Sequence, residues 1–539
     1  MRKLLIFITI LLSFIAANSA NALPVFPGAE GYGTNTTGGR ETGSILCKVN
    51  SAADTNTGCC GTACSIAEPS PTVCRGTFRY CATVGATPRM IVFRTGGNIV
   101  LSGDLNMNDP HMSIFGQTAP GSGIVISSTG NNGVNNRNIQ LGASDVLIQS
   151  MRFRVDDFDY STNACVSPSE NSLDVSTPTG GINNIVIDHC SLSWACNEIL
   201  NLGWYKDNTN FTLSWSIISE GFHLDTGTDK YGFGMNTGDI TGLTYYHNLS
   251  AHNGGRNFKM GGYETLDGSG KPITDMNSFT NGEAINNIIY NWSTNSLQIF
   301  ENQNYIPTAE EPARDIKVDI INNYWKHGID TEPFIGWSHE IIAAVDANEL
   351  AQKADAFVFI SGNYSDWHPT AFDVDSQWAN LVTGDSGSVS KSRVRACTPP
   401  SNVSITQSAT DAYNAVLNSA GAMSSLNPRD SVDTSVINDV RTGTGNQIYG
   451  RDAAFPTYTA GTAPTDSDLD GLPDTWENND GCASTNPSLA DTNTNGTLDW
   501  QEDCDGDGYW NIEEYATSLI STSAGDTTAP AAPSGLAVL

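Results

Sequence analysis

The sequence has few basic residues for its size. Its 539 residues include 26 Lys and Arg against 58 Asp and Glu, which gives a formal charge of −32. Affinity for nucleic acid comes mainly from Lys and Arg that neutralise phosphates, so we exclude nucleic acid as a partner. The chain also lacks a Gly-X-Y period and a run of heptads, which excludes collagen-like and coiled-coil folds.

The chain has no second long apolar run after its N-terminus. Residues 1–22 begin with Arg2 and Lys3, continue through the apolar stretch Leu4–Ala16 and end in small residues at Ala22. This pattern predicts a signal peptide cleaved after Ala22, and hence a secreted, extracellular protein with no membrane partner. An uncleaved N-terminal anchor is the alternative.

All 12 cysteines follow the predicted cleavage point. Six of them lie in one stretch rich in Gly and Thr: Cys47, Cys59, Cys60, Cys64, Cys74 and Cys81. In an oxidising compartment such a cluster favours disulfides, whereas a cytosolic setting would favour zinc ligation. The pairing cannot be deduced from the sequence.

Short β-rich runs bounded by Asn, Gly, Ser or Asp recur through the middle of the chain. They are residues 90–94, 146–150, 184–188, 211–215, 243–247, 288–290, 318–321 and 357–360. No long helical pattern separates them, so we expect loops as connections and disfavour a doubly wound α/β sheet.

Asn pairs recur beside these runs, at Asn183-Asn184, Asn286-Asn287 and Asn322-Asn323. In a parallel β-helix an inward Asn in each coil can bond to the next coil and form a ladder. The alternative is that Asn serves only as a good turn residue. Repetition at one place relative to the strands favours the ladder, and with it an all-β, parallel β-helix fold.

The sequence pattern changes after residue 400. Residues 410–420 predict a helix, with Gly421 just past its end. We divide the chain into a signal peptide (1–22), a β-helix domain (23–450), a linker (451–465), a calcium-loop segment (466–520) and a final segment (521–539). The final segment is a linker or the start of a truncated module, because it resembles the opening of a fibronectin type III domain.

Three twelve-residue windows after residue 465 fit a calcium-loop pattern. The pattern has oxygen ligands at positions 1, 3, 5, 9 and 12, with Gly at position 6 for a sharp turn. The ligand positions are Asp466, Asp468, Asp470, Asp474 and Glu477; Asp491, Asn493, Asn495, Asp499 and Glu502; and Asp503, Asp505, Asp507, Asn511 and Glu514. An acidic disordered linker, the alternative, would not explain the Gly register.

The second and third windows abut with no room for helices between them. In this respect the segment resembles thrombospondin type 3 repeats, in which calcium loops stack around little core. That resemblance predicts a calcium-stiffened stalk, with a disulfide between Cys482 and Cys504.

Several motifs, in order, resemble those of secreted bacterial pectate lyases. They are Phe26-Pro-Gly-Ala-Glu-Gly-Tyr-Gly33, Gly116-Gln-Thr-Ala-Pro-Gly121, Val186-Ile-Asp-His-Cys-Ser-Leu-Ser-Trp194, His247-Asn-Leu-Ser-Ala-His-Asn253 with Arg256-Asn257, and Arg429-Asp-Ser-Val-Asp433. The resemblance covers roughly residues 24–450. It implies a right-handed parallel β-helix and calcium-dependent β-elimination on polygalacturonate, an acidic polysaccharide.

The resemblance also implies a set of calcium ligands. Asp174 and Glu198 stand where the family has calcium-binding carboxylates, and Asp188 matches the Asp of its Ile-Asp-His motif, with a site-organising role. A third ligand usually follows the second by four residues; here Asn201, Leu202 or Asp207 are the options, so its identity stays open.

Arg256 matches the Arg that abstracts the proton in that family. The family has Arg-x-Pro at this place, whereas this chain has Phe258 instead of Pro. A guanidinium is almost always protonated, so a role limited to binding a uronate carboxylate is the alternative. By the same resemblance, Lys230 and Lys259 would bind substrate carboxylates.

Two other functions remain open. A β-helix hydrolase would need a pair of acidic residues and water, and only Asp156-Asp157 offers such a pair in a matching strand context. A noncatalytic, calcium-stiffened adhesin that binds pectin is the other alternative. We predict a monomeric, secreted pectate lyase with Ca²⁺ as cofactor.

Overall fold

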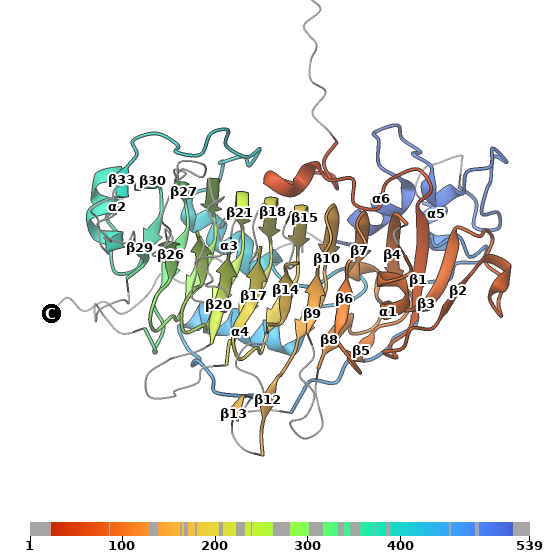
Figure 1. Ribbon diagram of the computed structural model, residues 1–539, viewed down its shortest axis with the longest axis horizontal. Coiled ribbons are helices and arrows are strands. Elements are labelled where there is room, and N and C mark those ends of the chain that lie inside the picture. The colour runs from red at the N-terminus through yellow and green to blue at the C-terminus, as the bar shows by residue number, and fades with distance from the viewer. Residues whose placement is uncertain are drawn as a thin grey trace, which may run out of the picture.

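The protein is a parallel β-helix, as predicted. The computed structural model describes residues 23–520, except 86, 129–137, 162–163, 166–170, 178–180, 204–207, 223–231, 239, 262–280, 301–315, 332–338, 345–355, 372, 384–388, 452–453 and 480–484. The chain visits three sheets in turn, adding one strand to each per coil, and nearly all neighbouring strands run parallel. Figure 1 shows the coils stacked along the long axis of the molecule.

The first sheet is the longest. Its strands, in spatial order, are β2 (Gly58–Cys60), β3 (Val73–Thr77), β1 (Ile45–Ser51), β4 (Arg89–Phe93), β7 (Met112–Phe115), β10 (Val146–Gln149), β15 (Asn183–Asp188), β18 (Asn208–Ser214), β21 (Ile240–Tyr246), β24 (Asn281–Ile285), β27 (Ile316–Ile321), β30 (Ala356–Ser361) and β33 (Val389–Lys391). The eight runs predicted from the sequence all belong to this sheet or, for residues 288–290, to the second.

The second and third sheets consist of shorter strands. The second contains β5 (Gly97–Val100), β8 (Ile124–Ser127), β11 (Arg152–Arg154), β16 (Ser191–Ser193), β19 (Ile217–Ser219), β22 (Leu249–Ala251), β25 (Ile288–Tyr290), β28 (Tyr324–Lys326) and β31 (Tyr364–Ser365). The third contains β6 (Leu105–Met107), β9 (Ile139–Leu141), β14 (Leu173–Val175), β17 (Glu198–Leu202) and β20 (Phe233–Thr237). A bridge between Phe233 and Gly255 continues it to β23 (Phe258–Met260), β26 (Leu297–Phe300), β29 (Ile341–Ala344) and β32 (Val382–Thr383).

Helices and a small hairpin complete the described structure. The hairpin joins β12 (Phe158–Asp159) to β13 (Ala164–Cys165). The α-helices are α1 (Phe78–Ala82), α2 (Val374–Leu381), α3 (Ala409–Ser419), α4 (Ser431–Thr442), α5 (Asp474–Glu477) and α6 (Asn511–Leu519), and the 3-10 helices are η1 (Tyr32–Asn35), η2 (Gly61–Ala63), η3 (Gly116–Thr118) and η5 (Asp499–Gln501). Helix α3 matches the helix predicted at 410–420 within one residue at each end. No helix among the described residues is long and apolar enough to cross a membrane.

The predicted Asn ladder is present. Asn248 donates to Asn287, Asn287 to Asn323 and Asn323 to Asn363, at 2.9–3.1 Å. In two of the predicted pairs the first residue, Asn286 or Asn322, has a positive φ and turns the corner out of the first sheet, while the second enters the ladder. Asn tolerates this left-handed conformation better than other residues with a Cβ, which explains why the pairs recur.

The pair Asn183-Asn184 differs from the other two. It begins strand β15 instead of following a strand, and Asn184 receives a bond from Asn210 and donates to Asp145. These residues form a second polar row, at the N-terminal ends of the strands of the first sheet.

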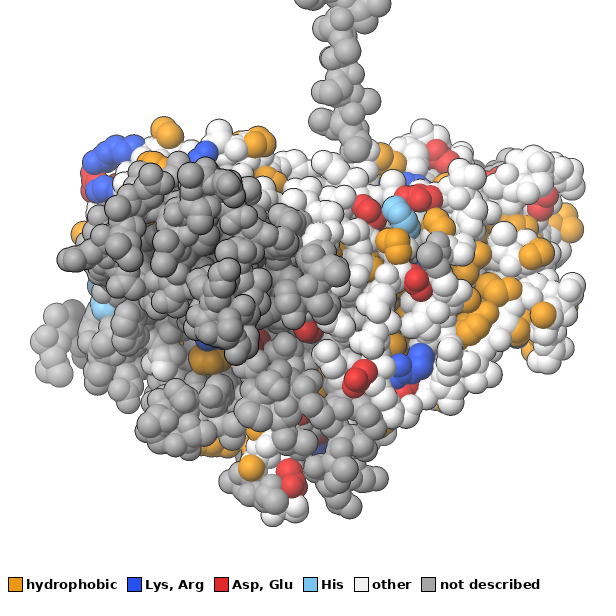
Figure 2. Space-filling view, viewed as in Figure 1, with side chains coloured by type: hydrophobic (Ala, Val, Ile, Leu, Met, Phe, Trp, Pro, Cys, Tyr) orange, Lys and Arg blue, Asp and Glu red, His pale blue; other side chains and the backbone are white. Residues whose placement is uncertain are grey.

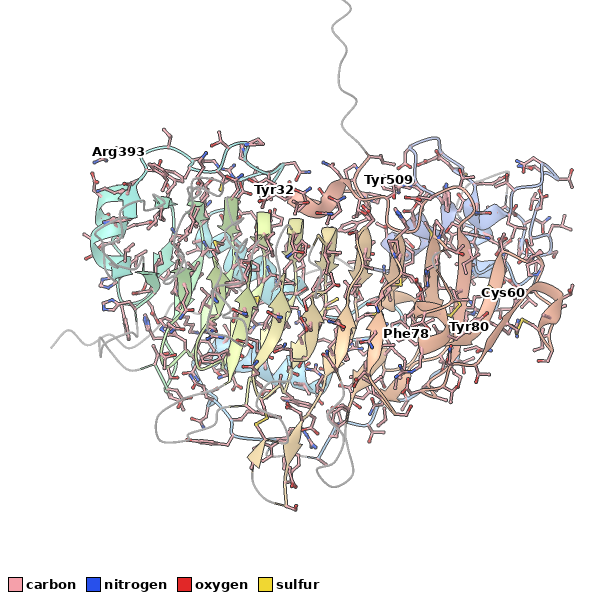
Figure 3. The ribbon with its side chains drawn as sticks, viewed as in Figure 1. Tyr32, Cys60, Phe78, Tyr80, Arg393 and Tyr509 are labelled. Carbon is pink, nitrogen blue, oxygen red and sulfur yellow. A yellow bond between two sulfur atoms is a disulfide. The ribbon has the colours of Figure 1, made fainter. Side chains whose placement is uncertain are left out.

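The cysteine cluster forms disulfides, as predicted. The described bonds are Cys47–Cys81, Cys59–Cys64, Cys60–Cys74 and Cys165–Cys196, and Cys504 is disulfide-bonded. The predicted partner of Cys504, Cys482, lies outside the described residues. Cys60, Phe78 and Tyr80 gather at the N-terminal end of the β-helix (Figure 3), where Cys60 Sγ lies 3.5 Å from the Tyr80 hydroxyl.

The calcium-loop segment does not form the predicted stalk. It folds back onto the outer face of the first sheet, where α5 and α6 lie beside the first strands (Figure 1). Leu472, Trp500 and Ile512 pack there in one buried cluster with Leu46 and Val92. Each such side chain contributes about 1.5–3 kcal/mol when buried, so this apolar contact favours docking over extension.

The segment predicted as a linker lies along the β-helix surface. Thr459 and Ala460 bond to the backbone around Ser122 and Gly96, and Arg94 donates to the Pro464 carbonyl. Helices α3 and α4 cover the second sheet through an apolar cluster that includes Val416 and Ile437. The C-terminal part of the chain is thus bound along the coils at several places.

Candidate active site

A row of polar side chains runs along the third sheet. Strand pairing places Asp174 next to Asn201 and Asn201 next to Asn236. Lys259 Nζ donates to Asn236 Oδ1 at 2.6 Å, Asn236 Nδ2 to Asn201 Oδ1 at 3.2 Å, and Asn201 Nδ2 to Asp174 Oδ1 at 2.8 Å. Because outward positions alternate along each strand, Leu200 and Leu202 point into the core while Asn201 joins the row.

Arg256 and Glu198 form an ion pair beside this row. Arg256 Nη1 bonds to Glu198 Oε1, and the guanidinium carbon lies 4.1 Å from the centre of the Phe233 ring. Arg256 has a positive φ of 51°, and its backbone NH donates to Asn295 Oδ1 at 2.7 Å. Phe258, in place of the family's Pro, begins β23 and packs in the core, so the replacement leaves Arg256 beside Glu198.

The charges in this cluster are poorly solvated. Burial raises the pKa of Asp174, and the nearby Glu198 raises it further. Burial lowers the pKa of Lys259 well below its usual range; the Arg256 charge adds to this effect, and Glu198 opposes it. A buried carboxylate whose ionised form is disfavoured, with a second carboxylate beside it, is a suitable place for a hard cation.

The structure reduces the number of candidates for the third calcium ligand. Asn201 presents its amide beside Asp174, whereas Leu202 is 2 % exposed and belongs to the core. Asp207 lies outside the described residues. Among the described residues, the candidates to hold a calcium ion here are therefore Asp174 and Glu198, with Asn201 as the candidate third ligand.

Asp188 is not part of this cluster. It ends strand β15 of the first sheet, whereas Asp174 is in the third. Gln149 and Ser214 donate to its carboxylate, and His189 Nδ1 lies 2.7 Å from it. With Trp215 it lines a cavity of about 260 Å³.

The N-terminal motif contacts the cavity beside Asp188. Several of the motifs matched in the sequence therefore lie close together. Residues Phe26 to Glu30 line the same cavity, and Gln117 of the Gly116–Gly121 motif donates to Gln149. A Cβ at Gly31 would lie 2.2 Å from Thr212 Oγ1, so only glycine fits there.

The structure describes only one of the two lysines that were predicted to bind substrate. Lys230 lies outside the described residues. Lys259 is 0 % exposed and bonds to Asn236 at the end of the row, so its predicted contact with substrate stays a prediction. The acidic pair Asp156-Asp157 is engaged too, because Asp156 pairs with Arg451 and Asp157 accepts from the Cys196 NH.

The first calcium loop has the strongest features of a metal site. Single oxygens of Asp466, Asp468 and Asp470 lie within 4.8 Å of one another. Buried oxygens of these residues and both oxygens of Glu477 have no hydrogen-bond partner among the described residues. Burial, with repulsion between the carboxylates, raises the pKa of Asp468 to about 6 and that of Glu477 to about 8. Such a loop is suited to hold Ca²⁺.

The ninth position of the pattern plays a different part from the one predicted. Asp474 accepts bonds from the NH and hydroxyl of Ser467, and Asp499 accepts the same two bonds from Thr492. Each of these two carboxylates therefore bonds to the residue at the second position of its own calcium loop.

The second and third loops are more open. In the second, Asn493 and Asn495 both donate to Glu502 Oε1, and Asp491 accepts from the backbone of Asn495 and Gly496. In the third, Asp503, Asp505 and Asp507 gather single oxygens within 4.8 Å but are exposed.

Asn236 and Phe233 were not predicted from the sequence. Both lie in strand β20, whose position next to β17 follows only from the stacking of the coils. The sequence contains the Asn at 236, but its neighbours 223–231 carry no strand pattern that would have fixed the register.

The chain is similar to fungal pectate lyases along almost its whole length. It is 27 % identical over 518 residues to a probable pectate lyase C of Aspergillus oryzae, covering 93 % of this chain and 96 % of the relative. It is 29 % identical over 522 residues to a probable pectate lyase C of Aspergillus fumigatus, covering 95 % and 98 %. No family model matches the chain.

Solved structures of pectate lyases show weaker similarity. One from Bacillus sp. N165, in complex with trigalacturonate, superposes with a TM-score of 0.38 at 12 % identity, covering 73 % of this chain and 98 % of its own. One from Erwinia chrysanthemi, with Ca²⁺, gives 0.34 at 15 %, covering 75 % and 99 %. The fold assignment rests on the strand pairing within the chain itself.

Proposed function

We propose that this protein is a secreted, calcium-dependent pectate lyase that cleaves polygalacturonate by β-elimination. The observation that carries the proposal is the meeting of Arg256, Glu198 and Asp174 on one sheet of a parallel β-helix. The curated relatives, named probable pectate lyases C, support the same activity. The disulfides and the predicted signal peptide support secretion, and the charge of −32 gives no reason to expect nucleic acid as a partner.

The reaction removes the C5 proton of a uronate and expels the sugar linked at C4. A calcium ion held by Asp174, Glu198 and Asn201 would withdraw charge from the uronate carboxylate and so acidify the C5 proton. The remaining steps require a base and a fixed substrate position, which the chain must provide.

Arg256 is the base in this proposal. In the structure the Glu198 carboxylate stabilises the protonated guanidinium through the ion pair. When Glu198 serves as a metal ligand, this ion pair would give way, and the guanidinium of Arg256 would face the substrate instead.

Ultraviolet absorbance of unsaturated product during incubation with polygalacturonate tests the proposal. We expect a rise with Ca²⁺, no rise with excess chelator, and loss of at least about 100-fold in rate for Arg256→Ala. Arg451→Ala is the matched control, because Arg451 also pairs with a carboxylate, Asp156, and lies over an aromatic ring, Tyr160.

Binding must be measured alongside turnover. If Arg256→Ala retains affinity for polygalacturonate, as determined by calorimetry, the loss lies in the chemical step. A folded wild-type protein that binds polygalacturonate with no unsaturated product would support the adhesin alternative and overturn the proposal.

A further inference from the structure

Histidine and glutamate side chains converge at the last coils of the β-helix. His327 follows strand β28, Glu340 precedes β29, and His368 follows β31. Glu340 Oε1 lies 4.0 Å from His327 Nε2 and 4.0 Å from His368 Nε2. These distances are too long for hydrogen bonds, so neither ring is bonded to Glu340.

The orientation of His327 is fixed from its other side. Its Nδ1 bonds to the Asp366 carboxylate, and its backbone NH also faces that carboxylate. The ring stacks on Trp367, which pairing of β28 with β31 places alongside it. Nε2 is thereby turned toward Glu340, and it has no hydrogen-bond partner among the described residues.

Glu340 is also buried with one polar atom left without a hydrogen-bond partner among the described residues. Its side chain is 0 % exposed; Oε1 accepts from Ser365 Oγ at 2.5 Å, while Oε2 has no partner among the described residues. Burial raises the pKa of Glu340 to about 7 and lowers the pKa of His327. A buried polar atom without a partner has lost its hydration with nothing to replace it, so a further bound group would compensate both atoms.

We propose that His327, Glu340 and His368 bind a divalent transition-metal ion of the zinc class. Two imidazole nitrogens and one carboxylate are a common zinc ligand set, and Ca²⁺ prefers a shell of oxygens. The Asp366–His327 bond matches the outer-shell carboxylate that orients metal-bound histidines.

His339 offers a fourth ligand. It precedes Glu340 directly, and its ring lies close enough to lower the pKa of His368. The ion would join the turns that follow β28, enter β29 and follow β31, tying two consecutive coils together. This site is independent of the calcium loops and of Arg256.

Cobalt titration of the full-length protein tests the proposal. Co²⁺ is added after metal removal, with Ca²⁺ in excess to fill the oxygen-rich sites. We expect one equivalent to bind with the visible absorption of a four-coordinate His-ligated ion. Asp366→Asn should weaken binding about 10–100-fold, as outer-shell changes do, and His368→Ala should weaken it further.

His189→Ala is the matched control, since His189 pairs with Asp188 but has no second His across a shared carboxylate. Circular dichroism establishes that each variant is folded, and the milder Asp366→Asn is read if His368→Ala fails to fold. Unchanged Co²⁺ affinity in Asp366→Asn or in folded His368→Ala, or no stoichiometric binding to the wild type, would overturn the proposal.

Discussion

Replacing Asp470 by Asn should change stability in opposite directions with and without calcium. Asp470 is 0 % exposed and crowded by Asp466 and Asp468. Burial and these neighbouring charges raise the pKa of Asp470, and the pKa of Glu477 rises to about 8. In calcium-free protein this carboxylate set therefore loses stability as the pH rises from about 4 to about 8, because its charged form is the disfavoured one.

The two effects have estimable sizes. A calcium ion bound at 100 times its dissociation constant stabilises the folded state by about 2.7 kcal/mol, most of which the variant should lose. Without calcium, the substitution removes one buried, repelled charge, and the amide can donate to a neighbouring carboxylate. We expect a gain of about 1–3 kcal/mol at pH 8, where the wild-type carboxylates are ionised.

Urea unfolding at pH 8, followed by the intrinsic fluorescence of the 11 tryptophans, measures both effects. Trp500 is 0 % exposed in the cluster between the calcium-loop segment and the first sheet, so it reports on that segment. Asp505→Asn, in the exposed third loop, is the control and should lower stability only in calcium. Equal destabilisation by Asp470→Asn with calcium and with chelator would refute the reasoning.

Three other substitutions test the site and the fold. Asn201→Asp adds a carboxylate beside Asp174 and should lower the calcium concentration for half-maximal activity about tenfold, or about 1.4 kcal/mol; an unchanged value would exclude Asn201 as a ligand. Lys259→Met should leave KM for polygalacturonate within about threefold because Lys259 is 0 % exposed; a large rise in KM would support its predicted contact with substrate. Asn323→Ala removes four side-chain bonds, two to Asn287 and one each to Asn363 and the Ala284 carbonyl, and should cost about 4 kcal/mol in thermal unfolding, at about 1 kcal/mol per bond; a loss below 1 kcal/mol would mean that the ladder is not a major source of stability.

The fold could be predicted because its repeating unit is local in sequence. Seven strands of the first sheet have their own predicted β-rich run, and two of the three Asn pairs combine a left-handed corner with an inward amide. The third sheet could not be predicted, because strands such as Leu173–Val175 contain three residues and take their register from neighbouring coils.

The site could be predicted only in part, because its motifs are local in sequence but their positions in space depend on the stacking of the coils. Asp174, Glu198 and Arg256 were found through their motifs, and the structure brings them together. Asp188 has an equally clear motif but ends strand β15 of the first sheet, whereas Asp174 and Glu198 lie in strands of the third sheet. The docking of the calcium-loop segment was missed because its apolar residues are sparse and their partners, such as Leu46, are hundreds of positions away.

The most direct test of the central claim is mass spectrometry of the polygalacturonate fragments released in ¹⁸O-labelled water. β-Elimination by the wild-type protein with Ca²⁺ predicts fragments with an unsaturated end, without the label introduced by bond cleavage, and none of them from Arg256→Ala. Saturated fragments that carry the label would show hydrolysis and contradict the account.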